Sequence, residues 1–183
     1  VAVSVDSQPI KMLRYTAKKY SVAVSFGYYE LCGEAIYSSY MFIGKNGEIV
    51  NNFRRVSKGW KEYDITDEHY KEGDGFKTFT YMGKRIALAV CGDLWYEENI
   101  EQINKEKFDF LLYPVYVTYN TEMWRTKLVN EYAEQAKKIP RPVFLVNSIC
   151  DADNTRGGCY AFLNGKTVCE VPMGQDGYLL VRV

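Results

Sequence analysis

The sequence predicts an α/β fold built around a mixed sheet. Strand-like segments alternate with helical patterns in the middle of the chain, whereas strand pairs joined by Gly-containing turns stand near both ends. The length of 183 residues suits one domain with a full-sized core, and 47% hydrophobic with 25% charged residues is typical of a globular protein. We find no repeat, low-complexity tract or linker that divides the sequence.

The first part of the chain begins with a predicted helix. Ser7 is placed to cap a helix that starts near Pro9, and Ile10, Leu13 and Ala17 fall on one face of it. This spacing predicts that the helix packs on a sheet through that face.

Strands and a loop follow this helix. Residues 21–26 are predicted as a buried strand that ends at Gly27, and residues 36–43 as a second strand. The pair Asn46-Gly47 then favours a tight hairpin turn. Residues 57–75 are polar and without periodicity, which indicates a long surface loop.

The middle of the chain has the pattern of parallel strands joined by helices. Residues 77–81 and 85–90 form a predicted hairpin, and the second arm is nearly continuous in apolar residues, as in a strand covered on both faces. The next elements are expected as a helix at 97–105, a strand at 108–114, a helix at 121–138 and a strand at 142–147. The inward positions of the two helices are Ile100 and Ile103, then Trp124, Leu128, Tyr132 and Ala136.

The last part of the chain is predicted to form hairpins. Strand segments at 159–163, 167–171 and 178–183 are separated by a turn at Asn164-Gly165 and another near residues 174–177.

Composition excludes several classes of partner. Basic and acidic residues number 23 each and no basic stripe stands apart, so no nucleic-acid partner is expected. No apolar run reaches the length of a membrane span. The five cysteines are odd in number and irregularly spaced, which favours reduced thiols and a cytoplasmic location.

Several catalytic arrangements are also excluded. His69 is the only histidine and lies in the polar loop. A Ser-His-Asp or Cys-His arrangement would therefore have to contain His69. No zinc-ligand spacing, Walker loop or Gly-x-Ser-x-Gly elbow occurs, and no metal is expected.

Cys91 is the residue that points to chemistry. It ends a buried strand, Gly92 follows it, and a helix begins a few residues later. Ligands of open α/β sheets bind beyond the carboxyl ends of strands, and a helix N-terminus or a nearby cation favours the thiolate. The Gly92 N–H is placed to approach a developing oxyanion. The alternative is that Cys91 is a small core hydrophobe.

The order of motifs resembles that of the nitrilase superfamily of carbon–nitrogen hydrolases. The runs RIALAVCGDLWYEE and FDFLLYPVYV are similar to its nucleophile segment and the strand that follows. YTAKKYSVAVSFGYYE, IYSSYMFIGKNGEIVNNFRR and the tail GGCYAFLNGKTVCEVPMGQDGYLLVRV resemble its preceding helix and strand, its Asn-Gly hairpin with a Tyr-Arg-Lys motif, and its closing hairpins.

The resemblance implies a four-layer αββα sandwich and covalent catalysis by a Glu-Lys-Cys triad. Cys91 would attack the carbon of a small amide or carbamoyl substrate, without a metal or organic cofactor. Such proteins commonly pair through the helical face, so a homo-oligomer, a dimer or higher, is expected. Residues 1–183 are expected to form a single carbon–nitrogen hydrolase-like domain that lacks its N-terminal strand, and with it the general-base glutamate.

Besides the missing N-terminal strand, the sequence departs from the family at Arg55, which stands at the position of the triad lysine. Arginine keeps the positive charge, but it is longer, planar and does not lose its proton. Lys58 and Lys61 follow in the loop as alternative cations, and Glu68 or Glu72 resembles an auxiliary glutamate.

Two aromatic residues are candidates for the substrate pocket, and two further functions are possible for the domain. Trp95 and Tyr116 stand near the ends of two strands and are candidates for the substrate pocket. Arg55 and the absent glutamate motivate a second hypothesis, a catalytically impaired nitrilase-fold module for binding or assembly. A third hypothesis is a redox-sensing thiol at Cys91.

Overall fold

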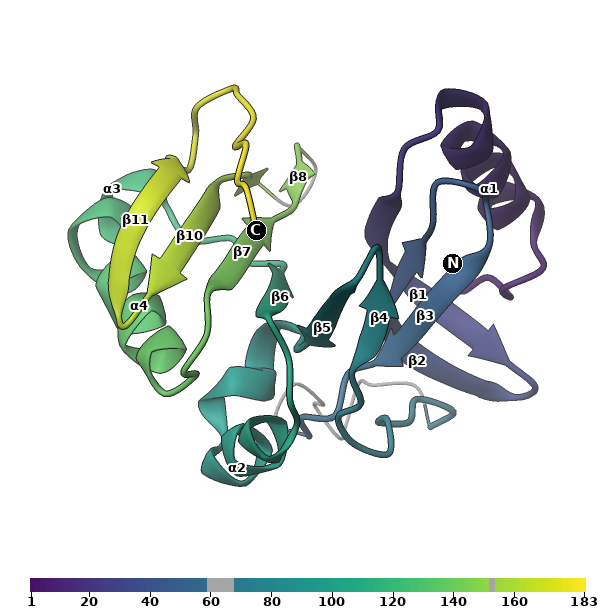
Figure 1. Ribbon diagram of the computed structural model, residues 1–183, viewed down its shortest axis with the longest axis horizontal. Coiled ribbons are helices and arrows are strands. Elements are labelled where there is room, and N and C mark those ends of the chain that lie inside the picture. Colours follow the sequence, from purple (N-terminus) through teal and green to yellow (C-terminus); the bar gives the residue numbers. More distant parts are fainter. Residues whose placement is uncertain (59–67, 152–153) are drawn as a thin grey trace. The chain divides into compact units, whose positions relative to one another are not determined.

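The computed structural model describes residues 1–58, 68–151 and 154–183 (Figure 1). The chain folds as two compact units, Val1–Gly75 and Phe76–Val183. Each unit has its own main sheet and its own hydrophobic cluster.

The helix of the first unit is α1 (Gln8–Tyr20), in agreement with the prediction. Ile10 and Ala17 are buried and Leu13 packs beside them, so the predicted face is confirmed. Ser7 occupies the N-cap position, although its side chain makes no capping hydrogen bond.

An antiparallel sheet in the order β1-β2-β3 completes this unit, with β1 at Val24–Cys32, β2 at Ala35–Ile43 and β3 at Ile49–Arg54. The predicted end of the first strand at Gly27 is wrong. The β1–β2 ladder runs without interruption from the pair Val24–Ile43 to the pair Cys32–Ala35, and Gly27 is one of its ordinary members. Nine cross-strand pairs outweigh the weak strand propensity of one glycine.

The α1-side face of this sheet changes from apolar to polar along its length. Buried Met41 and Ile43 contribute to the cluster beneath α1. Farther along, the carboxylate of Glu30 accepts hydrogen bonds from Ser39 Oγ at 2.7 Å and from Arg54 Nε at 2.9 Å and Nη2 at 2.7 Å. These bonds satisfy a carboxylate that is only 3% exposed.

The second unit contains a six-stranded sheet in the order β11-β10-β7-β6-β5-β4 (Figure 1). The strands are β4 (Phe79–Tyr81), β5 (Lys84–Leu88), β6 (Phe110–Val115), β7 (Val143–Asn147), β10 (Cys159–Leu163) and β11 (Lys166–Val171). The central strands β5, β6 and β7 are parallel, and the outer pairings are antiparallel. The predicted mixed sheet is therefore confirmed. A small sheet of β8 (Ile149–Cys150) and β9 (Thr155–Arg156) was not expected.

Two predicted hairpins of this unit are confirmed, and both have turns with positive φ angles. Met82 and Gly83 have φ of 49° and 78°, and Asn164 and Gly165 have φ of 51° and 76°. Two successive positive φ angles are the signature of a type I′ turn, whose twist matches that of the strands on either side.

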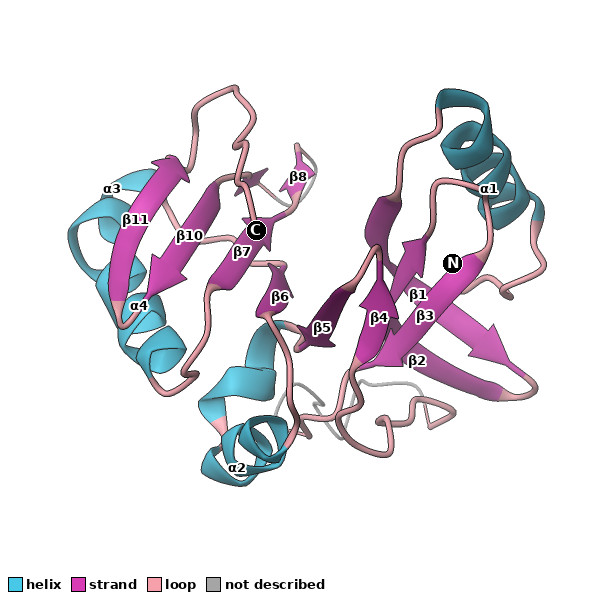
Figure 2. Cartoon of the chain, viewed as in Figure 1, coloured by secondary structure: helices cyan, strands magenta, loops and turns pink. Residues whose placement is uncertain are grey.

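The helices of the second unit contain one feature that the sequence pattern did not show. The 3₁₀ helix η1 (Cys91–Trp95) and α2 (Glu97–Lys105) follow β5, and α3 (Thr121–Met123) and α4 (Val129–Lys137) follow β6 (Figure 2). Between α3 and α4 lies a π-helical turn, η2 (Trp124–Leu128). The predicted inward positions are all buried: Trp124, Leu128, Tyr132 and Ala136. A spacing of four residues overshoots an α-helical turn of 3.6 residues, and the wider π turn compensates for it.

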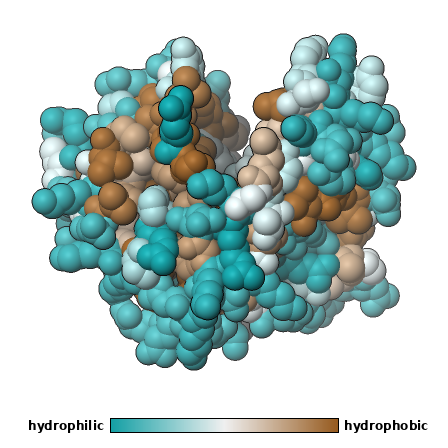
Figure 3. Space-filling view, in the orientation of Figure 1, coloured by the Kyte–Doolittle hydropathy of each residue, from teal (hydrophilic) through white to brown (hydrophobic). Residues whose placement is uncertain are grey.

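The two faces of the large sheet differ. Alternate residues of β6, which are Leu111, Tyr113 and Val115, belong to the main core cluster together with residues of α2 and α4. Residues of the opposite face, among them Phe110 and Phe144, line a pocket of about 300 Å³. Figure 3 shows apolar residues gathered over β10 and β11 on the side turned to the viewer.

The predicted strand at residues 178–183 is wrong. These residues form no strand, and Tyr178 and Leu180 are 82% and 83% exposed. Val181 and Val183 instead line the pocket on the sheet face. An apolar alternation becomes a strand only where a partner edge completes its hydrogen bonds.

Candidate active site

Cys91 lies just beyond the carboxyl end of β5, at the first residue of η1. It is half-buried, packs against the main core cluster of the second unit, and has a φ of 48°. A residue with a Cβ pays about 1–2 kcal/mol for this left-handed conformation, so the surrounding contacts must hold it.

Tyr113 supplies one of these contacts. Its hydroxyl donates a hydrogen bond of 2.6 Å to the carbonyl oxygen of Cys91, and its side chain is fully buried on β6. Burial raises the pKa of Tyr113 well above its ordinary value, and the neighbouring Tyr132, Cys91 and Asp93 add to the rise. The hydroxyl therefore remains protonated and able to donate.

Asp93 holds the same turn from the other side. Its carboxylate is fully buried and accepts a hydrogen bond of 2.8 Å from the backbone N–H of Val90. The backbone carbonyl of Asp93 accepts a bond of 3.1 Å from the side-chain amide of Asn99 in α2. The strand end, the turn and the next helix are thus connected by side-chain bonds on both sides of Cys91.

Aromatic side chains lie around this turn. Trp95, the last residue of η1, is 42% exposed and meets the ring of Tyr132 edge to face at 5.2 Å between centroids. Burial raises the pKa of Tyr132, with a further contribution from Cys91, so this phenol also remains neutral. Tyr116 directly follows β6 and is 46% exposed. The structure therefore places Cys91, Gly92, Trp95 and Tyr116 at the same edge of one sheet.

Asn147 joins the ends of the next two strands. It is buried at the end of β7, and its Oδ1 accepts a bond of 3.0 Å from the N–H of Val117, beyond β6. Its Nδ2 donates to the carbonyl of Gly157 at 3.1 Å. Sequence reasoning missed Asn147 and Tyr113. Each of these two residues places a polar group at an inward position of a predicted strand near the predicted site, and this pattern could have identified them.

Arg55 belongs to the first unit. It is 6% exposed, its Nε donates a bond of 2.7 Å to Ser57 Oγ, and its backbone N–H donates to the carbonyl of Ser38 at 2.9 Å. A guanidinium is charged at any ordinary pH, so this is a buried positive charge held by the end of β3.

The loop candidates of the first unit lie in different settings. The Gly73 N–H donates to the carbonyl of Arg55 at 2.8 Å, so the structure brings half-buried Glu72 next to the Arg55 backbone. Lys58 and Glu68 are exposed. Lys61 lies outside the described residues, as does the rest of the segment 59–67 of the predicted loop.

The described residues contain neither a cluster of metal-binding side chains nor a helix suited to a bilayer. Within residues 1–58, 68–151 and 154–183, no group of three or more His, Cys, Asp or Glu side chains is arranged to hold a metal ion. In the same part of the chain, no helix has the length and apolar character to cross a bilayer.

Comparison with known proteins shows the family of the chain. The sequence profile of the carbon-nitrogen hydrolase family matches residues 1–183. The chain belongs to the carbon-nitrogen hydrolase family. Among curated relatives of this family member is a citrullinase of Francisella tularensis, 26% identical over 120 residues, which are 62% of this chain and 41% of the relative.

Solved structures share the fold of this carbon-nitrogen hydrolase family member. A carbon-nitrogen hydrolase from Helicobacter pylori matches with a TM-score of 0.69 at 17% identity, covering 87% of this chain and 61% of the other. An amidase from Nesterenkonia sp. AN1, in a mutant with the acetamide moiety of fluoroacetamide added covalently at its active-site cysteine, matches with a TM-score of 0.69 at 15% identity, covering 89% and 62%. The predicted fold class, a nitrilase-like αββα sandwich, is confirmed. The chain spans less than two thirds of the length of these three proteins.

Proposed function

We propose that this protein is a thiol-dependent hydrolase of non-peptide carbon–nitrogen bonds, with Cys91 as the nucleophile and a small amide or carbamoyl compound as the substrate. The observation that carries the proposal is the conformation of Cys91: a half-buried thiol in a left-handed backbone conformation, at the carboxyl end of a parallel strand. Met82 and Asn164 have similar φ angles in hairpin turns, whereas Cys91 has it at the end of a parallel strand, and strained residues cluster at active sites.

The reaction would proceed through a covalent intermediate. A general base takes the thiol proton, the Cys91 sulfur attacks the carbonyl carbon, and the carbonyl oxygen becomes an oxyanion. The intermediate collapses as the carbon–nitrogen bond breaks, and the amine leaves with a proton. Water then attacks the thioester, which releases the acid and restores the thiol.

The other residues of the proposed site are assigned to binding the oxyanion, supplying a positive charge and contacting the substrate. The Gly92 N–H, in the first turn of η1, has no acceptor inside that helix, and we assign it to the oxyanion. Arg55 is the proposed site cation, because it is a buried, permanently charged side chain at the family position of the lysine. Lys58, Glu68 and Glu72 are proposed as auxiliary groups, with Glu72 favoured by its place beside the Arg55 backbone.

Trp95 and Tyr116 are proposed to contact the substrate, since both present exposed aromatic surface near Cys91.

Thiol labelling tests the nucleophile. Limited treatment with iodoacetamide at neutral pH, followed by peptide mass spectrometry, should label Cys91 ahead of the other four cysteines. Cys159 is the internal reference, because burial raises its pKa, against the effect of a backbone hydrogen bond at Leu179, and slows its reaction. Equal labelling of the five thiols would contradict the proposal.

Intact-mass analysis during incubation with small amides and carbamoyl compounds tests the chemistry itself. An acyl adduct on the wild-type protein, absent from Cys91→Ala and present in Cys159→Ala, is the expected result. A folded protein that hydrolyses none of these compounds and forms no adduct would instead indicate a binding or assembly module.

The proposal also covers the location, the assembly and the partners of the protein. We expect a cytoplasmic homo-oligomer that binds neither nucleic acid nor membranes, with residues 1–183 acting as one domain. The five free cysteines support the cytoplasmic location, and the equal numbers of acidic and basic residues support the expectation that no nucleic acid is bound. Sedimentation velocity measures the assembly, and a monomer at micromolar concentration would refute that part.

A further inference from the structure

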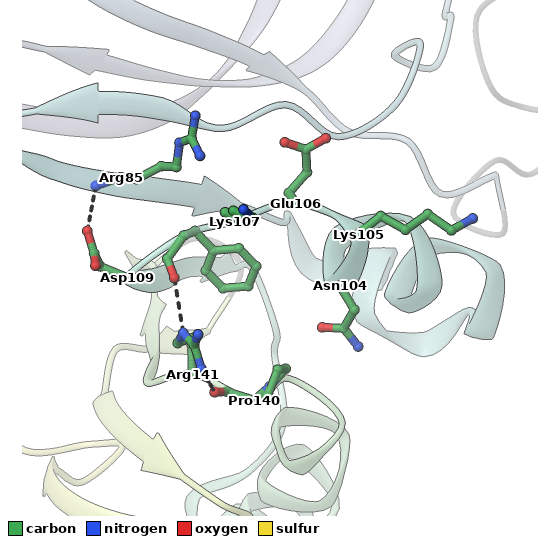
Figure 4. Close-up of a pocket in the computed structure, with 9 residues that line it drawn as sticks. Arg85, Asn104, Lys105, Glu106, Lys107, Asp109, Pro140 and Arg141 are labelled. Atoms are coloured by element: carbon green, nitrogen blue, oxygen red, sulfur yellow. Dashed lines mark hydrogen bonds between the residues drawn. The ribbon is translucent and has the colours of Figure 1, made fainter.

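A second pocket lies at the opposite end of the parallel strands from Cys91 (Figure 4). It has a volume of about 650 Å³ and is lined by Arg85 of β5, by residues 104–109 between α2 and β6, and by Pro140 and Arg141 before β7. This volume falls in the usual range for small-molecule sites, roughly 300–1,000 Å³. Cys91 lies six positions after Arg85 in the sequence, roughly 20 Å along an extended chain.

The pocket is more basic than the protein as a whole. Four cations line it, which are Arg85, Lys105, Lys107 and Arg141, against the carboxylates of Glu106 and Asp109. Within the described residues none of the four cations takes part in an ion pair. The chain carries 23 basic and 23 acidic residues, so this excess of positive charge is local. Like charges that gather without internal partners favour an anionic ligand.

Hydrogen bonds hold the lining in place. Arg141 donates through Nε to the carbonyl of Phe108 at 3.1 Å and through Nη1 to the carbonyl of Pro140 at 2.8 Å. Asp109 Oδ2 accepts from the backbone N–H of Arg85 at 2.7 Å, and Figure 4 shows this bond along one side of the pocket. One carboxylate is thus engaged by the backbone, and one guanidinium is oriented before a ligand arrives. A donor that is already in place loses little conformational entropy on binding.

We propose that this pocket binds a small phosphate-bearing anion. Two guanidinium groups and two ammonium groups provide planar and point-charge donors, the combination that suits phosphate oxygens. Phe108 and Pro140 add apolar surface for an organic group attached to the phosphate. The inference is independent of the hydrolase proposal, because it uses residues at the far end of the strands and is measured by binding alone.

Isothermal titration calorimetry of the 183-residue protein tests the proposal, with inorganic phosphate, pyrophosphate and AMP as probes in about 0.15 M salt. Saturable binding of at least one probe is the expected result. AMP bound about tenfold more tightly than inorganic phosphate indicates an organic phosphate, whereas similar affinities indicate free phosphate. The absence of saturable binding for all three probes would overturn the proposal.

Variants locate the binding. Arg85→Gln and Lys107→Gln should each weaken binding by about fivefold or more, through loss of a charge-assisted hydrogen bond. Neither side chain makes a hydrogen bond with another described residue, so both variants should fold normally. Arg125→Gln is the matched control, because Arg125 is an exposed arginine already paired with Glu122. Equal weakening in all three variants, or none in the two pocket variants, would refute a site here.

Discussion

The hydroxyl of Tyr113 donates a hydrogen bond of 2.6 Å to the backbone carbonyl of Cys91, and so joins the end of β6 to the turn that follows β5. The bond is made to the residue with the left-handed backbone conformation. The side chain that holds Cys91 in position is therefore 22 residues away in sequence and on a different strand.

Removal of that hydroxyl should affect both stability and turnover. Tyr113→Phe leaves the half-buried Cys91 carbonyl without this donor, and we expect a loss of about 1–2 kcal/mol in the free energy of unfolding. Under the proposed function, kcat should fall by roughly tenfold with a smaller change in KM, because the nucleophile is less well positioned. Denaturant unfolding and steady-state kinetics measure the two effects.

Tyr160→Phe is the matched control for this prediction. Tyr160 is also buried, and its hydroxyl accepts bonds from Trp124 Nε1 at 2.8 Å and from the N–H of Met173 at 2.8 Å. It should lose stability but keep the kcat of the wild type. A similar fall in kcat for both variants would show that Tyr113 acts only through stability.

The backbone conformation of Cys91 predicts an unusual order of stabilities. Glycine adopts a φ of 48° without strain, so Cys91→Gly should be more stable than Cys91→Ala by about 1 kcal/mol. At Cys159, the first residue of β10 and paired with both neighbouring strands, the order should reverse, because glycine weakens a strand. Chemical denaturation of the four variants measures the comparison, and the same order at both sites would contradict the strained conformation.

The hydrogen bond from the Val90 N–H to the Asp93 carboxylate should contribute to the stability of the folded protein. Asp93→Ala leaves the Val90 N–H without its acceptor in a partly buried turn, which should cost about 1–3 kcal/mol. Asp109→Ala is a suitable comparison, since Asp109 accepts a bond from the Arg85 N–H in an exposed position where water can replace it. Thermal unfolding should show the larger loss for Asp93→Ala. Equal losses would mean that burial does not govern the effect.

The Glu30–Arg54 pair predicts how stability depends on pH. Burial alone would raise the pKa of Glu30, but hydrogen bonds from Arg54 and Ser39 and the charge of Arg54 lower it below the ordinary value of 4.5. A carboxyl whose pKa is lower in the folded state contributes stability above its unfolded pKa and loses it as the pH falls through the folded pKa. Stability should therefore decline below about pH 4.5.

Glu30→Gln should flatten this acid limb of the stability curve, measured by denaturant unfolding between pH 3 and 7, roughly the range around a carboxyl pKa. Glu122→Gln, which removes an exposed carboxylate from its pair with Arg125, should leave the curve nearly unchanged because exposed pairs contribute little. An unaltered acid limb in Glu30→Gln would show that other carboxylates govern it.

Local patterns of the sequence determined the element types and led to the proposal of Cys91 as the nucleophile. Hydrophobic periodicity placed α1, α2 and the inward face of the helix after β6, and positive-φ turn residues marked two hairpins, because these signals act between residues close in the chain. Cys91 was recognisable because the end of an apolar strand, a glycine and a helix start are all local features.

Only the tertiary structure decided the rest. Pairing with β2 extended β1 through Gly27, while residues 178–183 formed no strand despite their alternation, because a strand requires hydrogen bonds to a neighbour that may lie anywhere in the chain. The bond from Tyr113 to Cys91, the link from Asn147 to Val117 and the pocket formed by three strand starts have the same origin. The energy of each contact depends on distance in space, which a one-dimensional pattern does not contain.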